Sequence, residues 1–127
     1  MKIAALICRI LLGLLFLVFG SNVFFQFIHM PPPTGIAGQF LTALFVSHYV
    51  IVIGLLELIP AILLLINRYV PLALTLLAPV LVNIFFYHVF MDPKGLPLAI
   101  IVIILWFVVA VSVKSAFAGL FQQKVSS

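Results

Sequence analysis

The sequence predicts an all-α membrane protein, a four-transmembrane-helix bundle with a short interfacial helix between spans one and two. Three observations lead to this prediction: 67% of the 127 residues are hydrophobic, only 6% are charged, and the mean hydropathy is +1.49. Soluble domains carry about 25% charged residues, so a chain of this size could not cover so apolar a surface in water. The length predicts a single integral-membrane domain over residues 1–127.

Four apolar runs are long enough to cross a bilayer, because about 20 helical residues span its hydrocarbon core. The first covers about 3–28 and ends at three consecutive prolines, which cannot continue a helix. The others cover about 49–66, 70–90 and 96–113. Polar or turn-forming residues separate these three runs, namely Asn67-Arg68 and the segment Met91-Asp92-Pro93-Lys94-Gly95.

The segment 36–46 lies between the prolines and the second run. Joined to that run it would form a helix of roughly 45 Å, which is too long for a hydrocarbon core of about 30 Å. We therefore expect a short interfacial or re-entrant helix over 36–46, with a bend near Ser47-His48.

The basic residues predict the topology. Four spans put both termini on one side, and five of the six basic residues fall on that side: Lys2, Arg9, Arg68, Lys114 and Lys124. Only Lys94 falls on the other. Basic residues concentrate in cytoplasmic loops, so we expect a multi-pass protein of the cell (inner) membrane with both termini cytoplasmic. Basic residues spread in this way do not form a nucleic-acid patch, and we expect no nucleic-acid partner.

Glu57 is the only acidic side chain within an apolar run. A carboxylate near the middle of a membrane span costs several kcal/mol unless it is protonated, paired or solvated, so it is by default a candidate functional residue. Gly54 and Ala61 have small side chains and lie on the same helical face as Glu57, so another helix can approach closely there. Two interpretations stay open: a functional acid, or a protonated carboxyl that joins two helices.

Arg9 in the first run is the natural partner of Glu57, and the two residues form a candidate buried charge pair. Breaking such a pair would cost roughly 3–5 kcal/mol, because the remaining charge would be buried alone. The alternative is that Arg9 extends toward the lipid headgroups.

A second polar group gathers toward the opposite side of the membrane. Its candidate cavity-lining or ligand-binding residues are Asn22, Gln26, Asn83, Tyr87 and His88. These residues either line a polar cavity or only join helices through hydrogen bonds of about 0.6–2 kcal/mol each. The histidines, His29, His48 and His88, lack close ligand spacing, so we predict no metal site. The single cysteine, Cys8, excludes an intrachain dithiol mechanism.

Several motifs resemble the DoxX/DoxD-like family of small four-helix membrane proteins. They are ICRILLGLLFLVFGSNVFFQFI from Ile7, MPPPTGIAGQFLTAL from Met30, GLLELIPAILLLINRYVPLALTLLAPVLVNIFFYHVF from Gly54 and the turn MDPKGLP from Met91. The resemblance covers nearly the whole chain and implies that Arg9, Glu57 and Asn83 occupy motif positions. Relatives in this broad group include thiosulfate:quinone oxidoreductase subunits, methylamine-utilisation proteins, and eukaryotic cargo receptors and chaperones. Their activities differ, so the resemblance does not define a reaction.

The leading functional hypothesis is an accessory or assembly subunit of a membrane-associated redox or detoxification system, with no complete active site of its own. Its partners would be the lipid bilayer and either an oxidoreductase protein or further copies of itself. One alternative is a quinone-binding oxidoreductase subunit that uses Glu57, with quinone as its cofactor. Another is a small proton-coupled transporter, against which the five-to-one charge bias argues.

Overall fold

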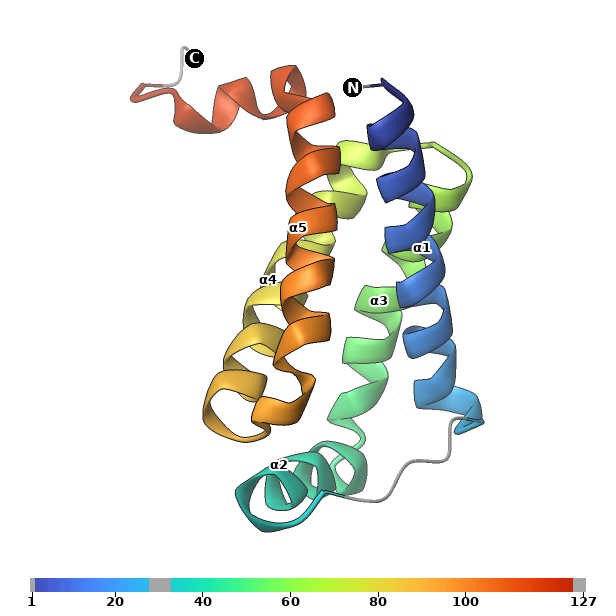
Figure 1. Ribbon diagram of the computed structural model, residues 1–127, viewed down its shortest axis with the longest axis vertical. Coiled ribbons are helices and arrows are strands. Elements are labelled where there is room, and N and C mark those ends of the chain that lie inside the picture. The colour runs from blue at the N-terminus through green and yellow to red at the C-terminus, as the bar shows by residue number, and fades with distance from the viewer. Residues whose placement is uncertain (1, 28–32, 125–127) are drawn as a thin grey trace.

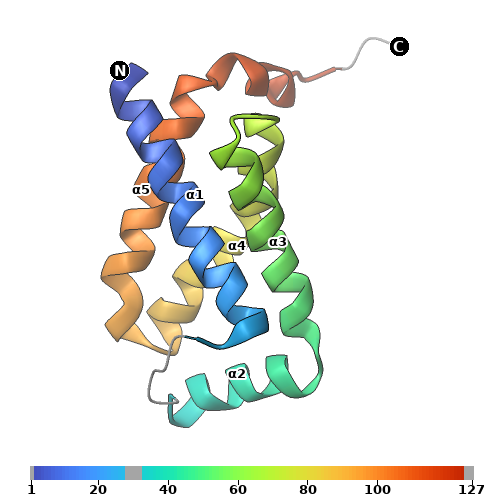
Figure 2. The same ribbon diagram turned by 90° about the vertical axis from the view of Figure 1, so that its right-hand side faces the viewer.

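The computed structural model describes residues 2–27 and 33–124, and their regular structure is helical throughout. The long helices are α1 (Lys2–Phe25), α3 (Tyr49–Leu65), α4 (Val70–Phe90) and α5 (Leu96–Ser112). The short elements are α2 (Gly35–Val46), η1 (Pro93–Gly95) and η2 (Lys114–Phe121). The start of α1, the α3–α4 turn and the end of α5 lie together at one end of the bundle, here named the terminal end, and α2 lies at the other (Figures 1 and 2).

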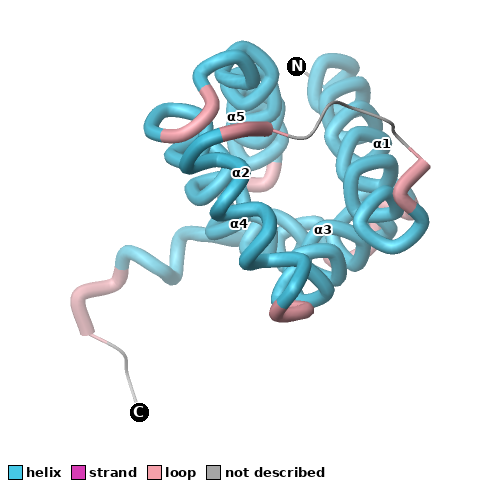
Figure 3. Tube along the Cα trace, turned by 90° about the horizontal axis from the view of Figure 1, so that it is seen from below, coloured by secondary structure: helices cyan, strands magenta, loops and turns pink. Residues whose placement is uncertain are grey.

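The four long helices form a ring. Helices α1 and α4 each pack against α3 and α5, as the view along the bundle in Figure 3 shows. Fully buried side chains fill the centre of the ring, among them Leu12, Phe16, Leu64, Leu74, Leu77 and Val109. Large aliphatic and aromatic side chains also cover the outer faces of all four helices. A surface this apolar suits a lipid environment better than water.

Among the described residues, three helical segments are long and apolar enough to cross a membrane: α1, α4, and η1 together with α5. Helix α3 has 17 residues, and it makes a fourth candidate together with α2, from which it is bent by 87°. The prediction of an all-helical protein with several candidate membrane spans is therefore confirmed.

The helix bounds agree closely with the sequence, except at the end of the first run. Helices α3, α4 and α5 match their predicted ranges to within one residue. The predicted end at residue 28 was wrong, because α1 stops at Phe25. Gln26 has a left-handed backbone with φ 50°, and its N–H donates to the carbonyl of Asn22 at 2.9 Å. Residue 28 itself lies outside the described residues.

Helix α2 and the bend after it occur where the sequence places them. Its bounds, Gly35–Val46, match the expected 36–46, and the break falls at Ser47-His48. The backbone of His48 is left-handed with φ 65°, which ends α2 and redirects the chain. The Ser47 hydroxyl then accepts the N–H of Tyr49 at 3.2 Å and satisfies a free donor at the start of α3.

Small residues bring α1 and α3 into close contact. A Cβ on Gly20 would lie 2.8 Å from Leu58 Cγ and 3.1 Å from the backbone nitrogen of Leu58. A Cβ on Gly13 would lie 2.9 Å from the side chain of Leu65. Such close approach maximises dispersion contacts, which drive helix association where water is absent. The α1–α3 interface is thus the tightest part of the ring.

Trp106 joins α5 to α4. Its indole Nε1 donates to the carbonyl of Leu74 at 2.9 Å, and its ring is half-buried. Its position between the two helices makes Trp106 a packing residue of the bundle.

Gly20→Ala is expected to destabilise the protein. Alanine favours a helix over glycine by about 1 kcal/mol, but its methyl group would push α1 away from α3, at an overpacking cost of about 1–3 kcal/mol. We expect a net loss of about 1 kcal/mol, measured as a lower Tm in mild detergent. Gly119→Ala is the matched control, because nothing lies within 4 Å of its added Cβ. A Gly20→Ala protein as stable as wild type would contradict the close contact.

Candidate functional site

Glu57 lies in the middle of α3 and is the only buried charged side chain among the described residues, at 7% exposed. No described residue forms a hydrogen bond or an ion pair with it. No polar side-chain atom in this part of the chain is both fully enclosed and unpaired. Because the carboxyl oxygens of Glu57 lack a hydrogen-bond partner, they are not fully shielded from a water-sized molecule, although the bundle encloses most of the side chain.

Arg9 crosses from α1 to the end of α3, where its Nη1 donates to the backbone oxygen of Leu64. Helix α3 ends in a Schellman motif: Arg68 N–H donates to Leu63 O at 3.0 Å, and Asn67, with φ 57°, donates to Leu64 O at 3.3 Å. The last carbonyls of a helix lack intrahelical partners and carry the negative end of its dipole. The guanidinium therefore acts as a cationic cap on α3.

This contact corrects the predicted Arg9–Glu57 charge pair, which the structure does not form. The guanidinium is bound at Leu64, seven residues beyond Glu57, which is about 10 Å along the helix axis. Both side chains lie at the same interface, as expected, but at different depths. The end of α3 offers Arg9 a nearer acceptor than the carboxyl does.

The polar residues of α1 occupy different environments. Asn22 is half-buried and takes part in an interaction, whereas the side chain of Gln26 is exposed beyond the end of α1. His29 lies outside the described residues.

The polar residues of α4 make contacts with different parts of the structure. Asn83 is exposed, and its Nδ2 donates to Pro79 O at 2.8 Å. The ring of Tyr87 packs on Phe40 of α2, with centroids 5.6 Å apart. The Nδ1 of His88 lies 2.9 Å from the carbonyl oxygen of Asp92 in the following turn. The structure thus does not gather Asn22, Gln26, Asn83, Tyr87 and His88 around one cavity, since α1 and α4 lie across the ring from each other.

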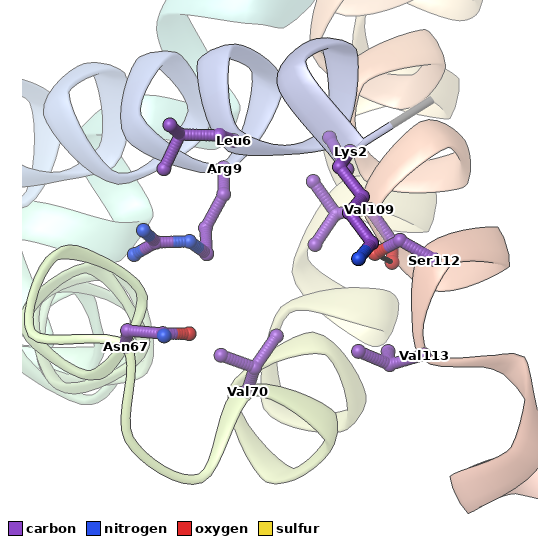
Figure 4. Close-up of a pocket in the computed structure, with 9 residues that line it drawn as sticks. Lys2, Leu6, Arg9, Asn67, Val70, Val109, Ser112 and Val113 are labelled. Atoms are coloured by element: carbon purple, nitrogen blue, oxygen red, sulfur yellow. Dashed lines mark hydrogen bonds between the residues drawn. The ribbon is translucent and has the colours of Figure 1, made fainter.

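A pocket of about 240 Å³ opens instead at the terminal end, between α1, the α3–α4 turn and α5 (Figure 4). Its polar lining consists of Lys2, Arg9, Asn67 and Ser112. Its apolar lining consists of Ala5, Leu6, Val70, Val109 and Val113. Figure 4 shows Lys2 beside Ser112 on one side of the pocket, and Arg9 with Asn67 on the other.

In the sequence, Lys2 served only to predict the topology and Asn67 only to mark a turn, so this pocket was not predicted. Its polar residues are separated by more than a hundred positions, from Lys2 to Ser112, so no local motif marks them. The available signal was that Ser112 is the only hydroxyl in the last apolar run and falls at the same membrane depth as Lys2.

The described residues contain no group of three or more His, Cys, Asp or Glu side chains that could hold a metal ion. His48 is exposed at the bend, and Cys8 is a half-buried free thiol on α1. The pocket at the terminal end is therefore the main concentration of polar side chains from several helices in this part of the chain.

No protein-family model, curated protein or solved structure matches this chain. The resemblance to DoxX/DoxD-like proteins thus stays a prediction, and function has to be argued from the site geometry.

A double-mutant cycle distinguishes the helix cap from a charge pair. Arg9→Met removes a charged hydrogen bond and should cost about 2 kcal/mol. Because the guanidinium lies about two helical turns from Glu57, the double variant with Glu57→Gln should equal the sum of the single effects to within about 0.5 kcal/mol.

Arg68→Met is the control for loss of a cation at the same end, since Arg68 is exposed, and it should change stability by less than about 0.5 kcal/mol. Unfolding free energies in detergent measure all four effects. A coupling of more than about 1 kcal/mol between Arg9 and Glu57 would restore the charge pair.

Proposed function

We propose that this protein is a four-span subunit of the cell (inner) membrane, with both termini cytoplasmic and α2 in the outer interface. We propose further that it is an accessory or assembly subunit of a membrane-associated redox or detoxification system. The charge bias of the sequence supports the topology, and its DoxX-like motifs support the class of system. The subunit role rests on one structural observation, the partly unpaired amide of Asn83 on the outer face of α4.

The outer face of α4 is a row of exposed residues at helical spacing: Leu72, Thr75, Pro79, Val82, Asn83, Phe86 and Phe90. Only part of the Asn83 amide is satisfied, because Nδ2 donates to Pro79 O while Oδ1 has no partner among the described residues. The hydroxyl of Thr75 donates back to the carbonyl of Pro71 at 2.8 Å. The row is therefore apolar with one partly unpaired amide.

An outward-facing amide is unfavourable against lipid, where no water satisfies it. Hydrogen bonding to another membrane helix removes this cost and contributes about 0.6–2 kcal/mol. Flanking apolar side chains such as Val82 and Phe86 would add dispersion contacts to the same partner. The α4 face is thus suited to a partner helix, as an accessory subunit requires.

A second candidate function is quinone binding at Glu57. It is favoured by a carboxyl that is mostly buried, lacks a partner among the described residues and is not fully shielded from solvent. When protonated, such a carboxyl can donate a hydrogen bond to a quinone carbonyl, and as a carboxylate it can accept one from a hydroquinone hydroxyl.

Site-specific photocross-linking tests the subunit role. A photoreactive amino acid at Phe86 should form an adduct with a different membrane protein in native membranes, because this position lies on the α4 face. The same probe at Ile59 is the matched control, since both side chains are 49% exposed but Ile59 lies on α3. Mass spectrometry of the adduct identifies the partner.

Equal labelling from both positions, or an adduct only with a second copy of this chain, would contradict the accessory role. Asn83→Leu should weaken the Phe86 adduct severalfold without lowering Tm, because it removes only the partly unpaired amide. An unchanged adduct would show that Asn83 does not contribute to the contact.

Glu57→Met tests the second candidate, because methionine has no group that donates a hydrogen bond to a quinone carbonyl. If the carboxyl binds a quinone, adding a soluble ubiquinone analogue should raise the Tm of wild type but not of this variant. Methionine is similar in length to glutamate and suits an apolar interior, so the variant should fold normally. A Tm of wild type that does not respond to the quinone analogue would remove this candidate.

A further inference from the structure

The pocket at the terminal end combines two cations with two neutral hydrogen-bonding groups. Arg9 uses Nη1 for the Leu64 carbonyl, and the remaining N–H donors of its guanidinium have no bond to any other described residue. Lys2 contributes three N–H donors, and Asn67 adds an amide. The hydroxyl of Ser112 donates to Val109 O at 2.5 Å and keeps its own oxygen as an acceptor. The pocket therefore presents mainly donors.

No acidic side chain of the protein lies near these cations. The chain has two acidic residues, of which Glu57 lies mid-way along α3 and Asp92 follows α4 at the opposite end. The terminal end also carries Arg68, Lys114 and Lys124, and no acidic side chain among the described residues at this end compensates their charge. An external anion is the natural counter-charge.

We infer that this pocket binds a phosphate group, held by Lys2 and Arg9 and by the Asn67 amide. A phosphate matches these groups because a guanidinium presents N–H donors in a fixed fork that fits its oxygens. The inference deepens the proposed function, on whose topology it rests, by placing this site at the cytoplasmic face of the membrane. Basic pockets between membrane helices on that side are known to accept phospholipid headgroups.

The apolar lining favours a phospholipid over free phosphate as the source. Valine, leucine and alanine side chains from α1, α4 and α5 form the rest of the pocket, next to the cations. The nearby outer surface is also apolar, with Ile3, Leu6 and Ile7 of α1 exposed. An amphiphile can place its phosphate on Lys2 and Arg9 and its acyl chains along this surface.

Ligand binding to the purified full chain in an uncharged detergent tests this inference. The probes are dioleoyl phosphatidylglycerol, dioleoyl phosphatidylcholine, dioleoylglycerol and inorganic phosphate, with affinities from native mass spectrometry and Tm shifts. We expect phosphatidylglycerol to bind more tightly than phosphatidylcholine, and dioleoylglycerol not to bind in the pocket. Saturation by millimolar inorganic phosphate, with no preference between the lipids, would instead assign the pocket to free phosphate.

Charge variants locate the binding. Lys2→Gln should weaken binding of phosphatidylglycerol about fivefold, and its exposed position on the first turn of α1 should leave folding unchanged. Lys114→Gln is the matched control, because it removes the same charge just beyond Ser112 but lies outside the pocket, and it should stay within about twofold of wild type.

The inference is overturned if neither anionic lipid nor phosphate binds, or if both lysine variants weaken binding equally. Binding in detergent does not depend on a partner protein or on orientation in the membrane. If neither lipid nor phosphate binds but the photoreactive probe at Phe86 still forms its adduct, only the phosphate site is therefore ruled out. The reverse combination would remove only the subunit role.

Discussion

The contact between α1 and α3 is the constraint on which the rest of the structure depends. Glycines at positions 13 and 20 let the two helices approach so closely that a single added methyl group would clash. Arg9 then reaches the end of α3 and caps it through the Leu64 carbonyl. This cap places a cation at the terminal end, and the close packing beside it encloses Glu57. Backbone carbonyls and dispersion contacts hold the interface, rather than an ion pair.

The two ends of the bundle consequently differ in chemistry. The terminal end gathers basic residues from α1, the α3–α4 turn and the segment after α5 without any acidic side chain. The opposite end is closed by α2, where Phe40 packs on Tyr87 of α4. Between the ends, the partly unpaired amide of Asn83 faces outward. A charged pocket, a mostly buried acid and an outward-facing amide are thus separated from one another.

Most helix bounds were predictable because local chemistry determines them, but the end of α1 at Phe25 was not. Prolines, the Asn67-Arg68 turn and the length limit of a membrane span mark the ends of the elements, including the bend after α2. Hydrogen-bond partners were harder to predict. Helical spacing gives the depth of Arg9 in the membrane, but it does not show which acceptor on the neighbouring helix the guanidinium reaches. Every face of each long helix carries apolar residues, so the hydrophobic periodicity of the sequence could not show that Asn83 faces outward. The pocket joins Lys2 to Ser112, and only the closed ring brings such distant positions together.

Solid-state NMR distance measurement on Arg9 tests the account most directly. The chain contains a single glutamate and two arginines, so Arg68→Lys leaves one guanidinium to label with ¹⁵N. The Arg9 ¹⁵Nη signal should be dephased by ¹³C in leucine carbonyls, because Leu64 O accepts its hydrogen bond. It should not be dephased by ¹³Cδ of Glu57. Dephasing by the glutamate label, and none by the leucine label, would contradict the cap and show that a charge pair holds α1 to α3.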